Sequence, residues 1–339
     1  MKKIVKSVRG FVLAALVASA PAAAQVTLNA SSWVSPGHPL TATMLVPLCA
    51  DIEKATSARV KCNILPKAPV GAVQTFDGVK DGLMDLSFVT HGYTPGRFAL
   101  TDAPEFPFMG DTAEVTAVAY QRIYERMLAG ANEHKDVVLL SVFTHGPGQM
   151  YNTKRAINTL KDLDGLKIRV GGGLVNEITK NLGAVPMLKP APESYELLST
   201  GVADGLFFPK ESPLSFKLVP LIKHVTYVPG GLYNVSFAWI ANQAKWNQIP
   251  EADRKAIQPL LGEALRVGRP VLRRRDVRDD QLRAERLRVV RGAAEGLALG
   301  VVVGDEDRVV GKHDVEAYLA ASKDFAPIDF APNHGANAL

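Results

Sequence analysis

The fold class is decided by residues 166–208, LKIRVGGGLVNEITKNLGAVPMLKPAPESYELLSTGVADGLFF. Short apolar runs predict β-strands at 166–170, 184–188 and 205–208. Apolar residues at helical spacing predict helices at 174–183 and 192–200. An alternating order of strands and helices is typical of parallel pairing, so this stretch predicts an α/β architecture.

The same alternation continues toward the N-terminus. Apolar or alternating runs predict strands at 26–33, 58–65, 84–89 and 137–143. Helical periodicity predicts helices at 40–52, 75–83 and 112–130. A chain of 339 residues that is 47% hydrophobic can bury a large core, and two sheets fit this length better than one.

The basic character of the chain is unevenly distributed. Residues 1–24 carry four basic side chains and no acid, whereas 25–263 carry 22 of each sign. Residues 264–291 carry ten arginines against four acids, and 292–339 carry three basic side chains against eight acids. Because most of the chain is neutral, the pI near 9.1 does not indicate a nucleic-acid partner.

The N-terminus has the pattern of a secretory signal. Basic residues at 2–9 precede the apolar run 11–20, and an Ala-x-Ala site at 22–24 follows. The apolar run is shorter than the roughly 20 residues that span a bilayer. We therefore expect cleavage after Ala24 and export to the periplasm; an uncleaved anchor is the alternative.

Export affects the interpretation of Cys49 and Cys62, the two cysteines of the chain. Cys49 lies late in a predicted helix and Cys62 in the strand that follows it. An oxidising compartment favours a disulfide between them, which would stabilise the fold by about 3 kcal/mol. Two buried free thiols are the alternative.

Several motifs of enzymes and cofactor sites are incomplete. The HGPG segment at 145–148 resembles an oxyanion-hole loop, but the chain has no G-x-S-x-G nucleophile elbow. The glycines at 171–173 lack the third glycine of a dinucleotide fingerprint, so they indicate either a close backbone approach to a ligand or a flexible turn. Histidines and cysteines show no metal-ligand spacing, and we expect no metal and no cofactor.

Arg169 is the most informative single residue. It lies at the end of an apolar strand, where a charge is costly unless it is paired. Its planar guanidinium suits a carboxylate, either of a ligand or of an internal Asp or Glu.

His91 and His145 also follow strands, each in a Thr-His-Gly triplet, and both could face a ligand or simply hydrogen-bond the backbone. Aromatic residues at strand ends suit an apolar organic ligand or an ordinary core: Trp33, Tyr93, Tyr151, Phe207, Phe208, Tyr233 and Phe237.

Four segments in order resemble one family. They are SPGHPLTATMLVPLCADIEKATSARVKCNILPK, a PGRF loop, LKDLDGLKIRV and LGAVPMLKPAPESYELLSTGVADG. The chain is similar over residues 26–263 to the solute-binding proteins of TRAP transporters. That resemblance implies a type II-like periplasmic binding protein in which two mixed sheets flanked by helices enclose a ligand cleft. It further implies lobe 1 at 25–145 with later chain returning, lobe 2 at 146–240, and helices bracing both lobes at 241–339.

The resemblance also implies a function. The family's arginine that grips the substrate carboxylate falls on Arg169, and the ligand is delivered to small and large membrane subunits. Family members that bind acidic sugars have a second arginine in the strand after residue 145, whereas the segment GPGQMYNT at 146–153 has none here, and Phe208 stands where the family often has Asn. We therefore expect a monocarboxylate with an apolar or aromatic body. The expected ligand-binding set is Arg169, Trp33, His91, Tyr93, His145, Gln149, Tyr151, Gly172, Phe207, Phe208 and Tyr233.

Some alternatives remain open on the sequence. A sensor ligand-binding protein would have the same fold, and an exported hydrolase using His145 would need a nucleophile or metal that the motifs do not supply. We expect a monomer, with a dimer as the alternative. From about residue 266 the resemblance fades into Arg-, Val- and Gly-rich sequence, which indicates either a divergent charged helix with an acidic tail or a frameshift.

Overall fold

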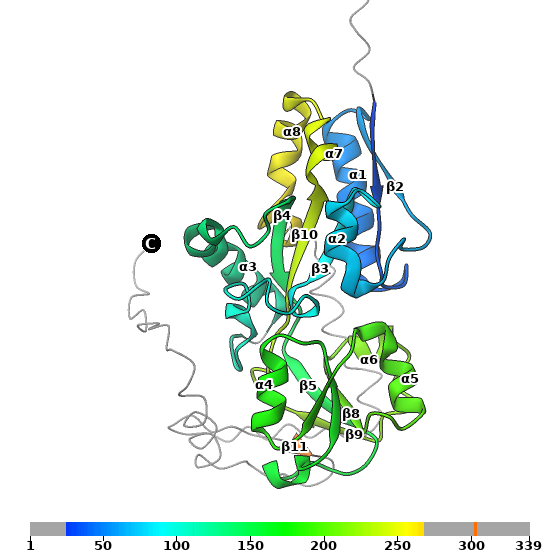
Figure 1. The fold of residues 1–339 in the computed structure, drawn as a ribbon, viewed down its shortest axis with the longest axis vertical. Helices are drawn as coiled ribbons and strands as arrows, with labels where there is room; N and C mark the ends of the chain where they lie inside the picture. The colour runs from blue at the N-terminus through cyan, green and yellow to red at the C-terminus, as the bar shows by residue number, and fades with distance from the viewer. Residues whose placement is uncertain (1–24, 111, 268–301, 304–339) are drawn as a thin grey trace, which may run out of the picture.

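The computed structural model describes residues 25–110, 112–267 and 302–303. Within these ranges the strands form one five-stranded and one six-stranded sheet, each in a lobe of its own (Figure 1). The prediction of two mixed sheets with flanking helices is therefore confirmed. The expected signal peptide at 1–24 and nearly all of the anomalous segment after residue 265 lie outside the described residues.

The first sheet has the strand order β2-β1-β3-β10-β4. Its strands are β1 (Val26–Ala30), β2 (Val60–Ile64), β3 (Leu86–Thr90), β4 (Val137–Thr144) and β10 (Ser236–Asn242). Strand β1 pairs in parallel with β2 and β3, whereas β10 is antiparallel to β3 and β4 on either side of it. The sheet is consequently completed by a strand from late in the chain.

The second sheet has the strand order β11-β9-β5-β8-β6-β7. Its strands are β5 (Gly148–Asn152), β6 (Lys167–Val170), β7 (Val185–Leu188), β8 (Gly205–Pro209), β9 (His224–Tyr227) and β11 (Val302–Val303). Strand β6 pairs in parallel with β7 and β8, as the stretch 166–208 predicts. Strand β5 is antiparallel to β8 and β9, a pairing that the alternation of strands and helices does not reveal.

Helices cover the sheets of both lobes (Figure 1). The first lobe carries α1 (Val46–Ala55), α2 (Thr75–Lys80), α3 (Ala113–Ile123), α7 (Gln243–Asn247), α8 (Glu251–Ile257) and α9 (Ala264–Val267). The second lobe carries α4 (Leu174–Asn181), α5 (Ser194–Ser199) and α6 (Ser212–Ser215). Helix α1 is preceded by a π-helical turn at Leu40–Leu45, next to Pro47, which has no N–H to continue the regular ladder.

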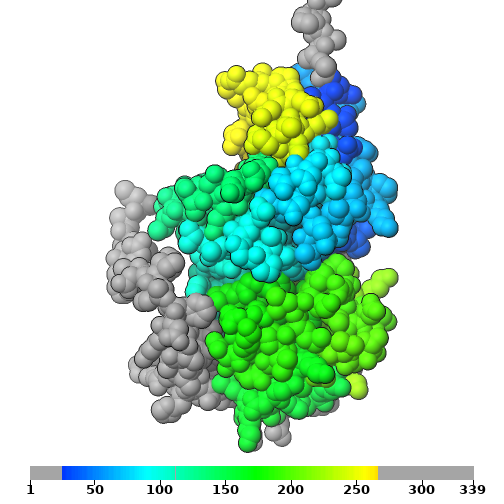
Figure 2. All heavy atoms as spheres, in the orientation of Figure 1, coloured from blue at the N-terminus to red at the C-terminus, as the bar shows by residue number. Residues whose placement is uncertain are grey.

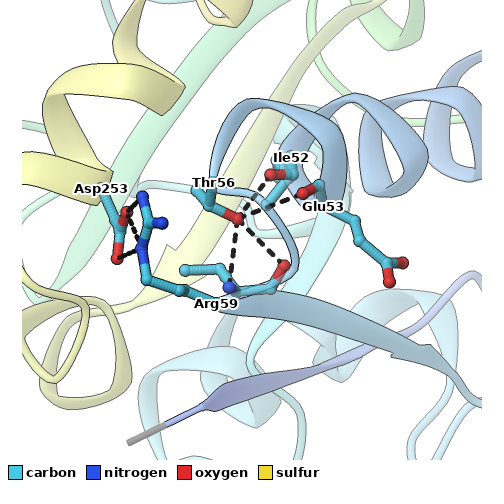
Figure 3. A network of polar contacts seen from close by, with 6 residues as sticks. Ile52, Glu53, Thr56, Arg59 and Asp253 are labelled. Carbon is cyan, nitrogen blue, oxygen red and sulfur yellow. Dashed lines mark hydrogen bonds and ion pairs between the residues drawn. The ribbon is translucent and has the colours of Figure 1, made fainter. Parts of the chain in front are cut away.

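The chain returns to the first lobe earlier than expected. The expected end of lobe 2 at residue 240 falls inside β10, which belongs to the first sheet. Helix α8 then packs against α1, and its buried Asp253 accepts hydrogen bonds from the Arg59 guanidinium, with the shortest N–O distance 2.6 Å (Figure 3). Helices α7 and α8 therefore extend the first lobe.

A disulfide joins Cys49 of α1 to Cys62 of β2, with their Cα atoms 5.4 Å apart. The bond predicted from the sequence is therefore confirmed, and it fastens a helix to the edge strand of the first sheet. No helix within the described ranges has the length and apolar character needed to cross a membrane.

Candidate ligand-binding site

A cavity lies where the two lobes meet, and residues of both lobes line it. Its empty volume is about 1040 Å³, with open solvent at the mouth included. Figure 2 shows the first lobe, in blue, cyan and yellow, packed directly against the green second lobe. Most of the lining is apolar, including Leu40, Met44, Phe143, Phe208, Phe216, Val235 and Phe237.

Arg169 of β6 supplies a positive charge at the wall of this cavity. Its side chain is 2% exposed, and its carbon Cζ lies 4.6 Å from the centre of the Phe208 ring. Nε donates to the carbonyl oxygen of Lys189 at 2.8 Å. None of the ion pairs found among the described residues involves Arg169. The guanidinium thus keeps N–H groups that can bind an anion.

Tyr93 of the first lobe reaches across to this arginine. Its hydroxyl oxygen accepts hydrogen bonds from Arg169 Nη2 at 3.3 Å and from the backbone N–H of Ala191 at 2.8 Å. Both lone pairs are then in use, and the phenol can act only as a donor toward a further group. Because Tyr93 lines the cavity, its O–H is a second donor close to the guanidinium.

Aromatic rings line the cavity beside these donors, and those of Trp33, Phe208 and Phe216 are called the aromatic slot below. Trp33 is held by a bond from Nε1 to the carbonyl oxygen of Phe88 at 3.1 Å, and its ring lies 5.8 Å from that of Tyr93. Phe208 and Phe216 stack at 5.4 Å with their planes 10° apart. Rings fixed in this way favour a planar apolar ligand.

His145 and Tyr233 complete the wall on the side of β5. The two rings are perpendicular, with centres 5.3 Å apart, and both line the cavity. The ring of Tyr233 lies over Gly148, where any Cβ would overlap it, so only glycine fits there. Burial, with a smaller contribution from the charge of Arg169, lowers the pKa of His145 to about 4. His145 is therefore neutral at physiological pH.

Six residues of the expected binding set line the cavity: Arg169, Trp33, Tyr93, His145, Phe208 and Tyr233. Three others belong to the core of the second lobe. Phe207 points to the opposite face of β8 from Phe208 and is fully buried. Tyr151 packs in an apolar cluster with Leu206. The side-chain oxygen of Gln149 accepts a bond from Val228 N at 2.6 Å, so its amide is used within the protein.

His91 is placed in the core of the first lobe and does not line the cavity. Its Nδ1 lies 3.0 Å from Ser236 Oγ, and its Nε2 lies 2.9 Å from Nε2 of His134. Burial, and secondly the neighbouring His134, lower its pKa well below the ordinary value. The alternative of a histidine satisfied within the protein is therefore the correct one.

The glycines at 171–173 make a close backbone approach, but to the other lobe. A Cβ on Gly172 would overlap the carbonyl oxygen of Gly92, and a Cβ on Gly173 would overlap the carboxylate of Glu105. Both glycines have positive φ, a conformation that other residues rarely adopt. Glu105 also accepts a bond from the backbone N–H of Leu174 at 3.0 Å. Gly172 is therefore an interlobe contact.

Sequence reasoning did not identify several residues of the cavity wall. They include His38, Thr90, Glu211, Ser212 and Phe216. His38 precedes the π-helical turn, and burial lowers its pKa to about 4. Thr90 ends β3, in which every residue is buried, and the others lie in loops or at the ends of the short helix α6, so no periodic pattern indicates which way these side chains point. Among the described residues, no group of three or more His, Cys, Asp and Glu side chains is placed to hold a metal ion.

The model of bacterial extracellular solute-binding protein, family 7, matches residues 30–278 of this chain. The chain belongs to this family. A TRAP periplasmic solute-binding protein from Bordetella bronchiseptica, solved with bound (R)- and (S)-mandelate, is 40% identical. The match covers 88% of this chain and 90% of that one, with a TM-score of 0.78.

Two further relatives are similar to most of this chain. A marine metagenome TRAP solute-binding protein in complex with 3-hydroxybenzoate is 28% identical over 88% of this chain and 91% of its own, with a TM-score of 0.75. A Comamonas testosteroni protein named outer membrane transporter protein TsaT is 31% identical over 75% of this chain and 77% of its own. The family consists of binding receptors, and this chain is a TRAP-type periplasmic solute-binding protein.

Proposed function

We propose that this protein captures an aromatic monocarboxylate in the periplasm and delivers it to the membrane subunits of a TRAP transporter. The observation that carries the proposal is Arg169, a buried cation with no acidic partner among the described residues, set against an aromatic slot. Mandelate and 3-hydroxybenzoate, bound by two similar proteins, have the same combination of one carboxylate and one ring.

The ligand carboxylate lies between the free N–H groups of Arg169 and the O–H of Tyr93. Charge-assisted bonds of this kind are about twice as strong as neutral ones. The ring of the ligand occupies the slot between Trp33 and Phe208. Exclusion of water from this slot strengthens the ion pair because the local dielectric is low.

Binding by both lobes also favours closure. Arg169 belongs to the second lobe and Tyr93 to the first, so one carboxylate held by both residues stabilises the arrangement in which the lobes touch. A ligand can shift such a hinge equilibrium only through its higher affinity for the closed state. Delivery then requires the membrane subunits to reopen the lobes.

The cellular setting forms part of the same proposal. The signal at residues 1–24 directs export, with cleavage after Ala24, and the mature protein acts as a monomer that binds its ligand and returns it unchanged. N-terminal sequencing of protein purified from the periplasm tests the cleavage site. Light scattering tests the oligomeric state, and chromatography of the released ligand tests for turnover.

Titration calorimetry of purified protein tests the ligand class. We expect benzoate and mandelate to bind, and succinate and glucuronate to bind far more weakly. Arg169→Gln should weaken binding by about 100-fold or more, because it removes the charge and the two-point contact with the carboxylate. Lys167→Gln, in the same strand but exposed, is the matched control and should bind like the wild type. Equal affinity of the wild type and Arg169→Gln would refute the proposal.

A further inference from the structure

We propose that His145 selects ligands with a hydrogen-bond donor on the carbon next to the carboxylate. The site then prefers a 2-hydroxy acid over the plain arylacetate and over the 2-oxo acid. This inference rests on the proposed function, because it takes the carboxylate to be bound by Arg169. The charge of Arg169 and the aromatic slot do not distinguish one aromatic acid from another, whereas His145 does.

The hydrogen bonds of His145 fix which ring nitrogen carries the proton. Nδ1 contacts the carbonyl oxygen of Gly146. A carbonyl oxygen can only accept, so Nδ1 must be the protonated, donating nitrogen. The ring is neutral at physiological pH because burial lowers the pKa of His145 to about 4. Nε2 is therefore an unprotonated acceptor.

The position of the ring presents this acceptor to the ligand. Nε2 is the other ring nitrogen, and none of the hydrogen bonds found among the described residues involves it. The ring lines the cavity and packs at right angles to Tyr233 and at 61° to Phe237, which holds its orientation. His145 and Arg169 line the same cavity, so a carboxylate bound by Arg169 shares that cavity with this ring.

The selection follows from hydrogen-bond complementarity. A 2-hydroxyl group donates to Nε2, whereas a methylene leaves the nitrogen desolvated and without a partner. A 2-oxo group brings a second acceptor against the lone pair of Nε2, which is less favourable still. His38 cannot make this distinction, because its Nδ1 accepts the Leu40 N–H at 3.2 Å and its neutral ring offers a donor instead.

Three ligands that differ at one position test the proposal on the wild-type protein. They are (R)-mandelate, phenylacetate and phenylglyoxylate, each titrated by calorimetry at pH 7. We expect mandelate to bind about tenfold more tightly than phenylacetate, and phenylglyoxylate to bind most weakly. Equal affinity for mandelate and phenylacetate overturns the inference and leaves the proposed function intact. Failure of all three to bind overturns the proposed function itself.

Two variants connect the selection to His145. His145→Phe keeps a ring but removes the acceptor, so the ratio of mandelate to phenylacetate affinity should fall close to one. His145→Gln restores an acceptor through its side-chain oxygen and should recover part of the ratio. His224→Gln, in β9 and outside the cavity, is the control and should keep the wild-type ratio. A wild-type ratio in His145→Phe would also overturn the inference, since the selection would then come from another group.

Discussion

The triplet Thr-His-Gly occurs twice in this chain, and its two copies have different roles. Thr90–Gly92 ends β3 and Thr144–Gly146 ends β4, on the two sides of β10. His91 of the first copy is 1% exposed, and both of its ring nitrogens have protein partners. His145 of the second copy has one such partner and lines the cavity.

The difference between the copies comes from what surrounds each strand end. Around the first copy the core supplies Ser236 and His134 as hydrogen-bond partners. The Nδ1 atom of His134 in turn lies 3.1 Å from the hydroxyl oxygen of Tyr124. Around the second copy the neighbours are the rings of Tyr233 and Phe237, and none of the hydrogen bonds found among the described residues involves Nε2. A histidine thus becomes available to a ligand where the protein leaves one of its nitrogens unpaired.

The largest expected contrast is in stability. His91→Ala should lower the free energy of unfolding by about 3 kcal/mol, because it opens a cavity and leaves Ser236 and His134 each without a buried partner. His145→Ala should lower it by about 1 kcal/mol, since it loses the contact within its own loop and the ring contacts with Tyr233 and Phe237 at the wall of an open cavity, without orphaning a second buried side chain. Urea unfolding monitored by circular dichroism measures both. A larger loss in His145→Ala would reverse the roles assigned to the two histidines.

The fold could be predicted from the sequence to a large extent. Residues 166–208 alternate between apolar strands and helices, and their parallel pairing follows from that order. The antiparallel β10 could not be placed in this way, because an apolar strand does not specify which sheet it joins. Its pairing with β3 and β4 depends on contacts between residues about 100 to 150 positions apart.

The site was predicted less completely, for a physical reason. Arg169 could be identified because a charge in an apolar strand needs a partner. Phe207 and Phe208 could not be distinguished, because every residue of β8 is buried and alternation between polar and apolar faces is lost. The same holds for Gln149 and Tyr151 in β5, which is also buried throughout.

Gly92 of the first triplet should affect ligand binding through the contact between the lobes. A Cβ on Gly92 would lie 2.7 Å from the backbone carbon of Gly172 and from the nitrogen of Gly173, across the interface between the lobes. Gly92→Ala should therefore hold the lobes apart and weaken binding of an aromatic acid by about tenfold. Calorimetry measures the affinity, and small-angle X-ray scattering measures how far the protein contracts when ligand is added.

Gly130→Ala is the control for this experiment. Gly130 does not line the cavity, and a Cβ there would have no atom within 4 Å. Its affinity should stay within about threefold of the wild type, because no backbone has to move. Wild-type affinity and contraction in Gly92→Ala would show that the lobes close without the contact between Gly92 and Gly172.

The threonines give the smallest contrast. Thr144 Oγ1 lies 2.7 Å from Thr116 Oγ1, so Thr144→Val should lower the free energy of unfolding by about 1 kcal/mol through the loss of that bond. Thr90 Oγ1 is buried with no partner within the described ranges, so Thr90→Val should leave stability unchanged or raise it slightly. Thermal unfolding of the two unliganded variants measures the difference, and a larger loss for Thr90→Val would contradict it.

Thr90 also lines the cavity, so weaker binding by a fully stable Thr90→Val would mean that this hydroxyl takes its hydrogen-bond partner from the ligand.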